Sequence, residues 1–189
     1  MNKSLDIIHE EHRALAAMLS GMRTLVVGIE AGRLKPDFTL LSDMIRYIDE
    51  VPEVVHHPKE DQFLFAKLRQ RSAEALPYIE QLETDHRQGA ARIVALRSAL
   101  ESYRQAGESG FPGFKMALTV YLEQEWHHMN TEEHQIFPLA RKYLTAEDWA
   151  EIDAAFLANG NPWEGPAGEY AKLFSRIVNM APAPVGLGG

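Results

Sequence analysis

Apolar residues recur every three or four positions along four stretches of this chain, and no stretch alternates polar and apolar residues as a strand does. The four stretches lie at about residues 5–26, 41–63, 79–100 and 114–139. Because short loops separate them, the pattern predicts an all-α fold, an antiparallel up-down four-helix bundle. Pro52 and Pro58 fall inside the second stretch and remove backbone donors, so we expect that helix to kink or divide.

Two shorter helical patterns follow the fourth stretch. Thr145 and Asp148 have the spacing of a capping box, which starts one helix, and Tyr170 lies on the apolar face of the other. The segment from Ala181 to the end is expected to be a frayed tail. We therefore divide the chain into a bundle, residues 1–144, and a C-terminal extension with two additional short helices, residues 145–189. Four aromatic residues of the extension could cap the bundle or form a homodimer contact: Trp149, Phe156, Trp163 and Phe174.

The composition limits the chemistry. The chain has 189 residues and no cysteine, which excludes disulfides, zinc–thiolate sites and iron–sulfur clusters. Any metal must be held by imidazole and carboxylate. A net charge of −8 without a basic cluster argues against a nucleic-acid partner. No apolar run approaches the roughly 20 residues of a membrane span, and the first residues lack the apolar region of a secretory signal, so we expect no membrane association and a cytoplasmic location.

Six polar residues interrupt the apolar stripes at core-facing positions. They are one histidine per predicted bundle helix and two glutamates: His12, His56, His86, His128, Glu60 and Glu132. A buried carboxylate costs on the order of several kcal/mol unless it is paired or bound to a cation. Six such residues on four helices indicate a metal site.

A repeated pattern strengthens this interpretation. The first arm, His56–Phe65, and the second arm, His128–Phe137, both have the pattern His-x-x-x-Glu-acidic-x-x-aliphatic-Phe. The i, i+4 spacing places imidazole and carboxylate one turn apart on one helical face. Two such arms facing each other predict a two-metal site. A kink at Pro58 would re-aim His56 relative to Glu60, so the second arm is the cleaner evidence.

These elements resemble the hemerythrin-like, or histidine–histidine–glutamate cation-binding, family over about residues 1–144. The matching elements are Glu11-His12-Arg13, His56-x-x-x-Glu60, His86, and His128-x-x-x-Glu132 followed by Ile136-Phe137-Pro138. The resemblance implies a hemerythrin-type bundle with a non-haem di-iron centre, two iron ions with an oxo or hydroxo bridge. It also implies the metal ligands, with both carboxylates bridging: His12, His56, Glu60, His86, His128 and Glu132.

The third stretch departs from the oxygen-carrying members of the family, which have a second histidine one turn after the first. Ala90 stands at that place, with Gly89 beside it. Four imidazoles and two bridging carboxylates fill about eight positions of two six-coordinate ions, and a bridging oxide adds about two. About one position on each ion is then open. This favours binding oxygen, nitric oxide or peroxide, or releasing iron, over simple oxygen transport.

Four other histidines lie near the predicted ligands in the sequence. His9 lies one turn before His12 and is an alternative ligand. His57 and His127 sit about 100° around a helix from their neighbours His56 and His128, so we expect them to support the ligands or lie at the surface. His134 is expected on the solvated face.

Glu125 lies one turn before His128 and could be a further ligand, a hydrogen-bond partner of a ligand or a proton relay, and Tyr121 could line the site. Ferritin-like proteins use Glu-x-x-His instead, a pattern that occurs here from Glu53, Glu83 and Glu125. Glu83 lies beside the core residue Leu82, which disfavours that reading. Zinc is chemically possible at the same residues.

The leading functional hypothesis is a di-iron protein that binds or senses a small ligand (oxygen, nitric oxide or peroxide), or handles iron under stress. The alternatives are a peroxidase- or oxidase-like enzyme and a bundle with a purely structural metal. No Ser-His-Asp arrangement or phosphate loop supports another enzyme class. Whether the protein is an enzyme stays open at this point.

Overall fold

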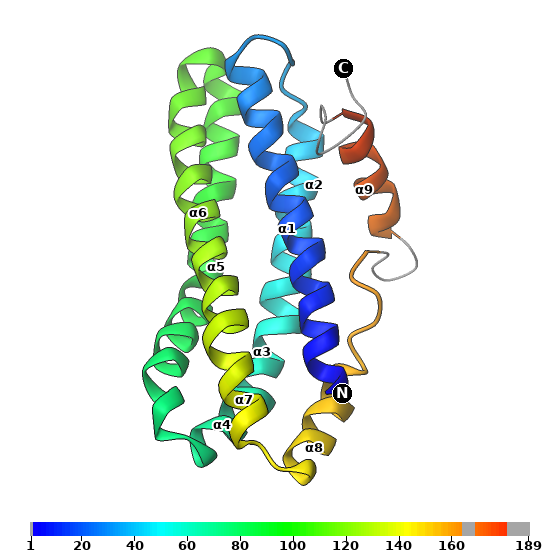
Figure 1. Cartoon of the computed structure of the whole chain (residues 1–189). Helices are drawn as coiled ribbons and strands as arrows, with labels where there is room; N and C mark the ends of the chain where they lie inside the picture. Colours follow the sequence, from blue (N-terminus) through cyan, green and yellow to red (C-terminus); the bar gives the residue numbers. More distant parts are fainter. Residues whose placement is uncertain (1, 164–168, 181–189) are drawn as a thin grey trace.

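The computed structural model describes residues 2–163 and 169–180, and all regular structure in these residues is helical. Helix α1 spans Lys3–Glu30 and is followed, after a turn in which Gly32 has a φ of 67°, by α2 at Phe38–Ile48. The Asp37 side chain caps α2 by accepting a hydrogen bond from the backbone N–H of Leu40 at 2.9 Å. Figure 1 shows these two helices side by side.

The second helical stretch is divided into short pieces of different winding. A π-helical segment, η1 (Asp49–His56), leads into a single α-helical turn, α3 (His57–Lys59), and then into a second π-helical segment, η2 (Glu60–Phe65), and α4 (Ala66–Arg71). Pro52 lies inside η1, where it cannot donate to an α-helical hydrogen bond. The expected disturbance at the prolines is therefore present as a widened helix.

The third and fourth stretches are long helices joined at one end by a short turn. After a 3₁₀ turn, η3 (Ala73–Ala75), helix α5 spans Leu76–Ala106. The 3₁₀ turn η4 (Gly107–Gly110) joins it to α6, Phe111–Thr131, which continues through a π-helical segment, η5 (Glu132–Ile136), into α7, Phe137–Tyr143. Gly107 has a φ of 62°, a conformation that favours glycine and ends α5. α5 and α6 pack along their length (Figure 1).

The core has two apolar clusters with a polar layer between them. One cluster holds residues such as Leu19 and Leu96, and the other holds residues such as Ile8, Leu82 and Ile136. Every predicted metal ligand lies, along its own helix, between residues of one cluster and residues of the other. The apolar clusters thus enclose the polar residues and exclude water from both sides.

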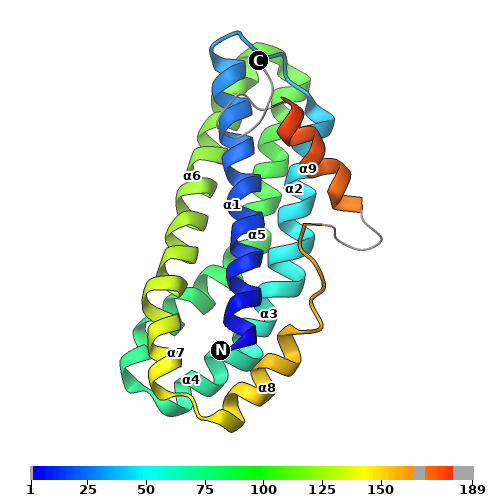
Figure 2. The ribbon, with the colours of Figure 1, turned by 45° about the vertical axis from the view of Figure 1, so that its right-hand side comes forward.

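The C-terminal extension packs on the bundle. Helix α8 (Ala146–Phe156) begins with the predicted capping box, which is confirmed because Thr145 and Asp148 each accept from the other's backbone N–H. Helix α9 (Glu169–Met180) lies against α1 and α2, as Figure 2 shows. Phe156 is fully buried and Trp163 packs on Phe174 at 4.9 Å between ring centroids, so these aromatics cover the bundle.

Three expectations about the extension are not decided by this packing. The homodimer and the division at residue 144 stay predictions. The predicted tail from residue 181 and part of the preceding loop, residues 164–168, lie outside the described residues. None of the described helices has the length and apolar character needed to span a membrane.

Candidate metal centre

All six predicted ligands meet in the polar layer. His12 comes from α1, His86 from α5 and His128 from α6, while His56 ends η1 and both glutamates begin a π-helical segment. Each of the six side chains is at most 5% exposed. Together with one further histidine they form two groups, in each of which the ligand atoms lie within 4.8 Å of one another.

The first group consists of His12, His56, Glu60 and Glu132. His12 Nε2 lies 2.9 Å from Glu132 Oε2, and His56 Nε2 lies 3.3 Å from Glu60 Oε1. Two imidazoles and two carboxylates thus face one point between α1 and the second helix. Nitrogen and oxygen donors of this kind suit a divalent transition metal.

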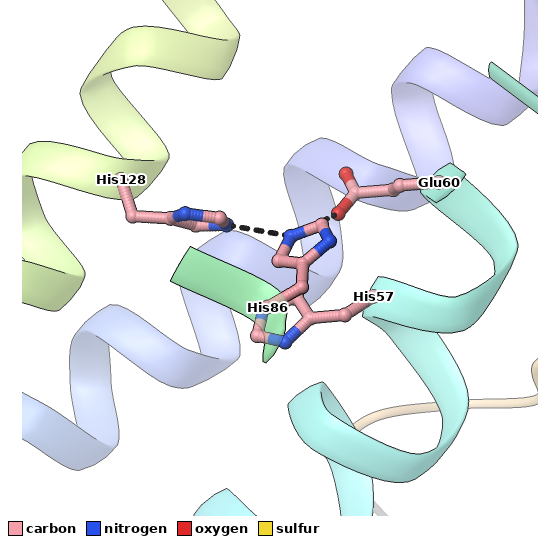
Figure 3. A group of neighbouring side chains, drawn as sticks. All are labelled: His57, Glu60, His86 and His128. Atoms are coloured by element: carbon pink, nitrogen blue, oxygen red, sulfur yellow. Dashed lines mark hydrogen bonds and ion pairs between the residues drawn. The ribbon is translucent and has the colours of Figure 1, made fainter. Parts of the chain in front are cut away.

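The second group consists of His57, Glu60, His86 and His128, shown in Figure 3. His86 Nε2 lies 3.1 Å from His128 Nε2 and 3.7 Å from Glu60 Oε2. Two imidazole nitrogens this close, each with a carboxylate oxygen beside it, are arranged as ligands of one ion.

The two glutamates lie between the groups. Glu132 directs Oε2 at His12 and Oε1 at His128, which is 3.1 Å away. Glu60 directs Oε1 at His56 and Oε2 at His86. Each carboxylate therefore offers one oxygen to each group, which is the arrangement that two bridged cations require.

Of the two positions expected for His57, a support for the ligands or the surface, the surface position is wrong, and His57 belongs to the second group. His57 is 5% exposed and its ring stacks on that of His86 at 4.2 Å between centroids. The expectation assumed the α-helical angle of about 100° between His56 and His57. In the structure the π-helical segment η1 ends at His56, and the wider winding there allows two consecutive side chains to face inward.

A carboxylate stands behind each of the five histidines, on the Nδ1 side. Three are within hydrogen-bonding distance, at 2.7–2.9 Å, and two are farther, at 3.6–3.7 Å. The pairs are His12 with Glu133, His56 with Glu11, His86 with Asp61, His57 with Glu53 and His128 with Asp85. A carboxylate that accepts from Nδ1–H keeps the Nε2 lone pair free for a metal and makes the ring more basic.

The sequence contained a signal for two of these supporting residues. Asp61 and Glu133 are the acidic residues that follow the glutamate in each arm, and each contacts the histidine of another helix rather than of its own arm. The repeat was noticed without a role for these residues. Glu11 and Asp85 stand directly before His12 and His86 in the chain, and neither was singled out as a support.

The electrostatics of the cluster show how protons balance its carboxylates. Burial alone lowers the pKa of His56 and of His128, but the charges of Glu60 and Glu132 beside them raise both pKa values well above the ordinary one. Burial, together with the charges of His86 and His128, lowers the pKa of His57 well below its ordinary value. Without metal, protons on some imidazoles balance the carboxylates, and a divalent cation can replace those protons.

The inner polar atoms fit a metal pair. The buried Nε2 atoms of His12 and His56, and both oxygens of Glu60 and of Glu132, have no hydrogen-bond partner in the described part of the chain. Buried polar atoms left in this state are costly unless something satisfies them. A family model, the hemerythrin HHE cation-binding domain, matches residues 3–140.

The chain belongs to the hemerythrin family. This confirms the resemblance drawn from the arms, and the two buried groups give this hemerythrin domain the residues with which to bind cations. Neither the curated proteins nor the solved structures compared with the chain gave a match.

The remaining candidates lie outside the two groups of this hemerythrin domain. The side chain of His9 is 57% exposed and contacts Glu133, so His12 is the histidine of α1 that faces inward. His127 and His134 are exposed. Glu83 pairs with Arg69 at 2.7 Å, away from the cluster, which removes one of the three Glu-x-x-His pairs of the ferritin-like alternative.

The third helix lacks the second histidine of the oxygen carriers, and the residues at that place differ in burial from what the sequence suggested. Ala90 is exposed, and Gly89 is the buried residue. A Cβ at Gly89 would overlap the carboxylate of Glu53, which stands behind His57. Glycine at this position therefore makes room for the carboxylate that supports the additional histidine of the second helix.

Proposed function

We propose that residues 1–144 form an antiparallel up-down four-helix bundle of hemerythrin type that holds two iron ions, and that the protein binds or senses a small ligand such as oxygen, nitric oxide or peroxide. One observation carries this proposal. Five buried imidazoles converge on the two carboxylates of Glu60 and Glu132, and each imidazole has a further carboxylate behind it. In this proposal the ligands are the six predicted residues and His57.

The fifth imidazole changes the expected coordination. Three imidazoles, two carboxylate oxygens and a bridging oxide or hydroxide fill about six positions at the ion beside His57, His86 and His128. The same count at the ion beside His12 and His56 reaches about five. We therefore place the open position on the side of His12 and His56. Iron there supplies an open coordination position and one-electron redox chemistry.

The structure gives this open side a suitable environment. A cavity of about 10 Å³ adjoins His12 and His56, with room for about one water-sized or diatomic molecule. Its other walls are formed by Leu15, Val51 and Pro52, together with Glu11 and Tyr47. A small ligand held there is separated from bulk water, and no larger substrate fits.

The test is metal analysis of aerobically purified protein, paired with visible spectra with and without azide. We expect two irons per chain, absorption bands of an oxo- or hydroxo-bridged di-iron centre, and a new band with azide. Iron-loaded protein whose spectrum ignores azide and nitric oxide would favour a purely structural metal, and zinc in place of iron would exclude the redox role.

An enzyme with peroxidase- or oxidase-like activity is the second candidate, favoured by one feature. Glu125 is 3% exposed and Glu53 is nearby, and burial raises the pKa of both carboxyls although the charges of Arg92 and His128 act in the opposite direction. The charge of Glu125 adds to burial in raising the pKa of Glu53 to about 7. These carboxyls could supply protons to a reduced ligand. Steady turnover of peroxide with a reductant would support this candidate, and binding without turnover would support the sensor.

A further inference from the structure

The cavity beside His12 and His56 shares two lining residues with a hollow nearer the surface. A larger hollow of about 420 Å³ lies next to it, between η1 and the segment 159–162 of the C-terminal extension. Val51 and Glu11 line both the small cavity and the larger hollow. Val54, on the rim of the hollow, is 66% exposed, so the hollow opens to solvent on this side.

The segment 159–162 is held in place as the outer wall of this hollow. Asn159 Nδ2 donates to Glu11 Oε1 at 2.7 Å, and the other oxygen of Glu11 accepts from His56 Nδ1. Tyr47, which lines the small cavity, donates from its hydroxyl to the backbone carbonyl of Pro162 at 3.2 Å. Figure 2 shows this part of the chain, in orange, running along the second helix between α8 and α9. The extension thus contacts two residues that line the inner cavity.

The two spaces meet at Glu11 and Val51, of which only Val51 is apolar. Of the two residues that line both, Glu11 is hydrogen-bonded to His56 and Asn159, whereas the Val51 side chain makes only apolar contacts, against the main core cluster. The outer hollow is lined by valines, by Pro162 and by the carboxylates of Glu11 and Glu50, and none of its described lining residues is basic, while Arg46 pairs with Glu50 at 3.6 Å. Such a path favours small neutral molecules over anions.

We propose that neutral diatomic ligands reach the His12–His56 side of the metal centre through this hollow, and that Val51 sets the size of what passes. The proposal rests on the proposed function, since it concerns entry to that centre. It assigns the C-terminal extension a role as one wall of the entry path.

The experiment measures the association rate of nitric oxide with the reduced, iron-loaded protein by stopped flow. We expect Val51→Trp to slow association by about one order of magnitude or more, and Val51→Ala to speed it. Val94→Trp is the matched control, because Val94 is a 61% exposed valine on α5 away from both cavities, and it should leave the rate unchanged. Iron content and the visible spectrum are measured for each variant.

If Val51→Trp loses iron, two other variants test the path. Val51→Ala only removes volume, and we expect faster association. Val54→Trp enlarges an exposed residue at the mouth of the hollow, and we expect slower association. Unchanged rates in variants that keep their iron would overturn the entry path while leaving the metal centre intact. Absence of iron from the unsubstituted protein would instead overturn the proposed function, and the entry path with it.

Discussion

The first arm, His56–Phe65, and the second arm, His128–Phe137, share a sequence pattern and a local structure, and the difference that bears on the metal centre lies at their second residue. In both, a π-helical segment begins at the glutamate. In both, the acidic residue after that glutamate contacts a histidine of another helix. The second residue is His57 in the first arm and Met129, part of the apolar core, in the second.

This difference shows how a symmetric frame acquires an asymmetric centre. The shared residues place one histidine and one bridging carboxylate per arm, and the preceding π-helical segment, present only before the first arm, turns an additional imidazole inward. One side of the cluster then has three imidazoles and the other has two. In our proposal this asymmetry decides which ion keeps an open position.

The largest expected effect is the loss of bound metal, and it is the same for the glutamate of either arm. Glu60→Ala and Glu132→Ala should each reduce bound metal from two ions per chain to background, because Glu60 belongs to both groups and Glu132 has one oxygen beside His12 and the other beside His128. Metal analysis by mass spectrometry measures this. Glu80→Ala, an exposed change on α5, is the control. Retention of two ions by either buried variant would show that the carboxylates do not bridge. Glu60→Gln and Glu132→Gln keep the side-chain volume, so they separate metal loss from misfolding.

A smaller effect should follow when the first arm is made to resemble the second. In His57→Met, we expect one of the two ions to bind at least about tenfold more weakly, since removing a ligand should cost no less than the roughly 10–100-fold typical of a supporting residue. Chelator competition measures the affinity. His127→Met is a matched control because His127 directly precedes His128 but is exposed and contacts Gln81. Equal affinities in the two variants would remove His57 from the ligand set.

The supporting residues should give similar, weaker effects in both arms. We expect Asp61→Asn and Glu133→Gln each to weaken metal binding by about tenfold. Each substitution removes the carboxylate that contacts a histidine, and the imidazole of that histidine becomes less basic. The same competition assay applies, with the exposed Glu80→Gln as control. A loss confined to one arm would contradict the symmetric part of the comparison.

A last prediction concerns the stability of the metal-free protein and Glu53, three residues before His56, whose counterpart is Glu125, three before His128. Burial and the charge of Glu125 raise the pKa of Glu53 from 4.5 to about 7, so its ionised form disfavours the folded state. The cost is absent below about pH 4.5, grows as the pH rises toward 7 and is complete above it. Glu53→Gln should therefore stabilise the metal-free protein at pH 8, by up to about 3 kcal/mol, and not at pH 4. Thermal unfolding at the two pH values measures this, and an equal gain at both would refute the account.

The helices could be predicted because apolar periodicity extends over whole turns. The spacing also placed His12, rather than His9, on the inward face, and the structure agrees. The winding of the second helix could not be predicted in the same way. Pro52 indicated a disturbance, but whether a proline kinks, breaks or widens a helix depends on the packing around it.

The residues of the cluster that lie in α-helical geometry could be predicted from their spacing. His57 was missed because the prediction applied an α-helical angle to a π-helical segment. Glu53 as a support for His57 was missed for a related reason, since it stands one turn before a histidine that was not expected among the ligands. Asp61 and Glu133 were visible as part of the repeat, and only the fold shows which histidines they contact.

The most direct test of the central claim is a crystal structure of the aerobically purified protein with anomalous diffraction measured at the iron edge. We predict two anomalous peaks per chain, one between His12 and His56 and one among His57, His86 and His128, with Glu60 and Glu132 between them. A single peak, or two peaks that leave His57 without a metal contact, would contradict the account.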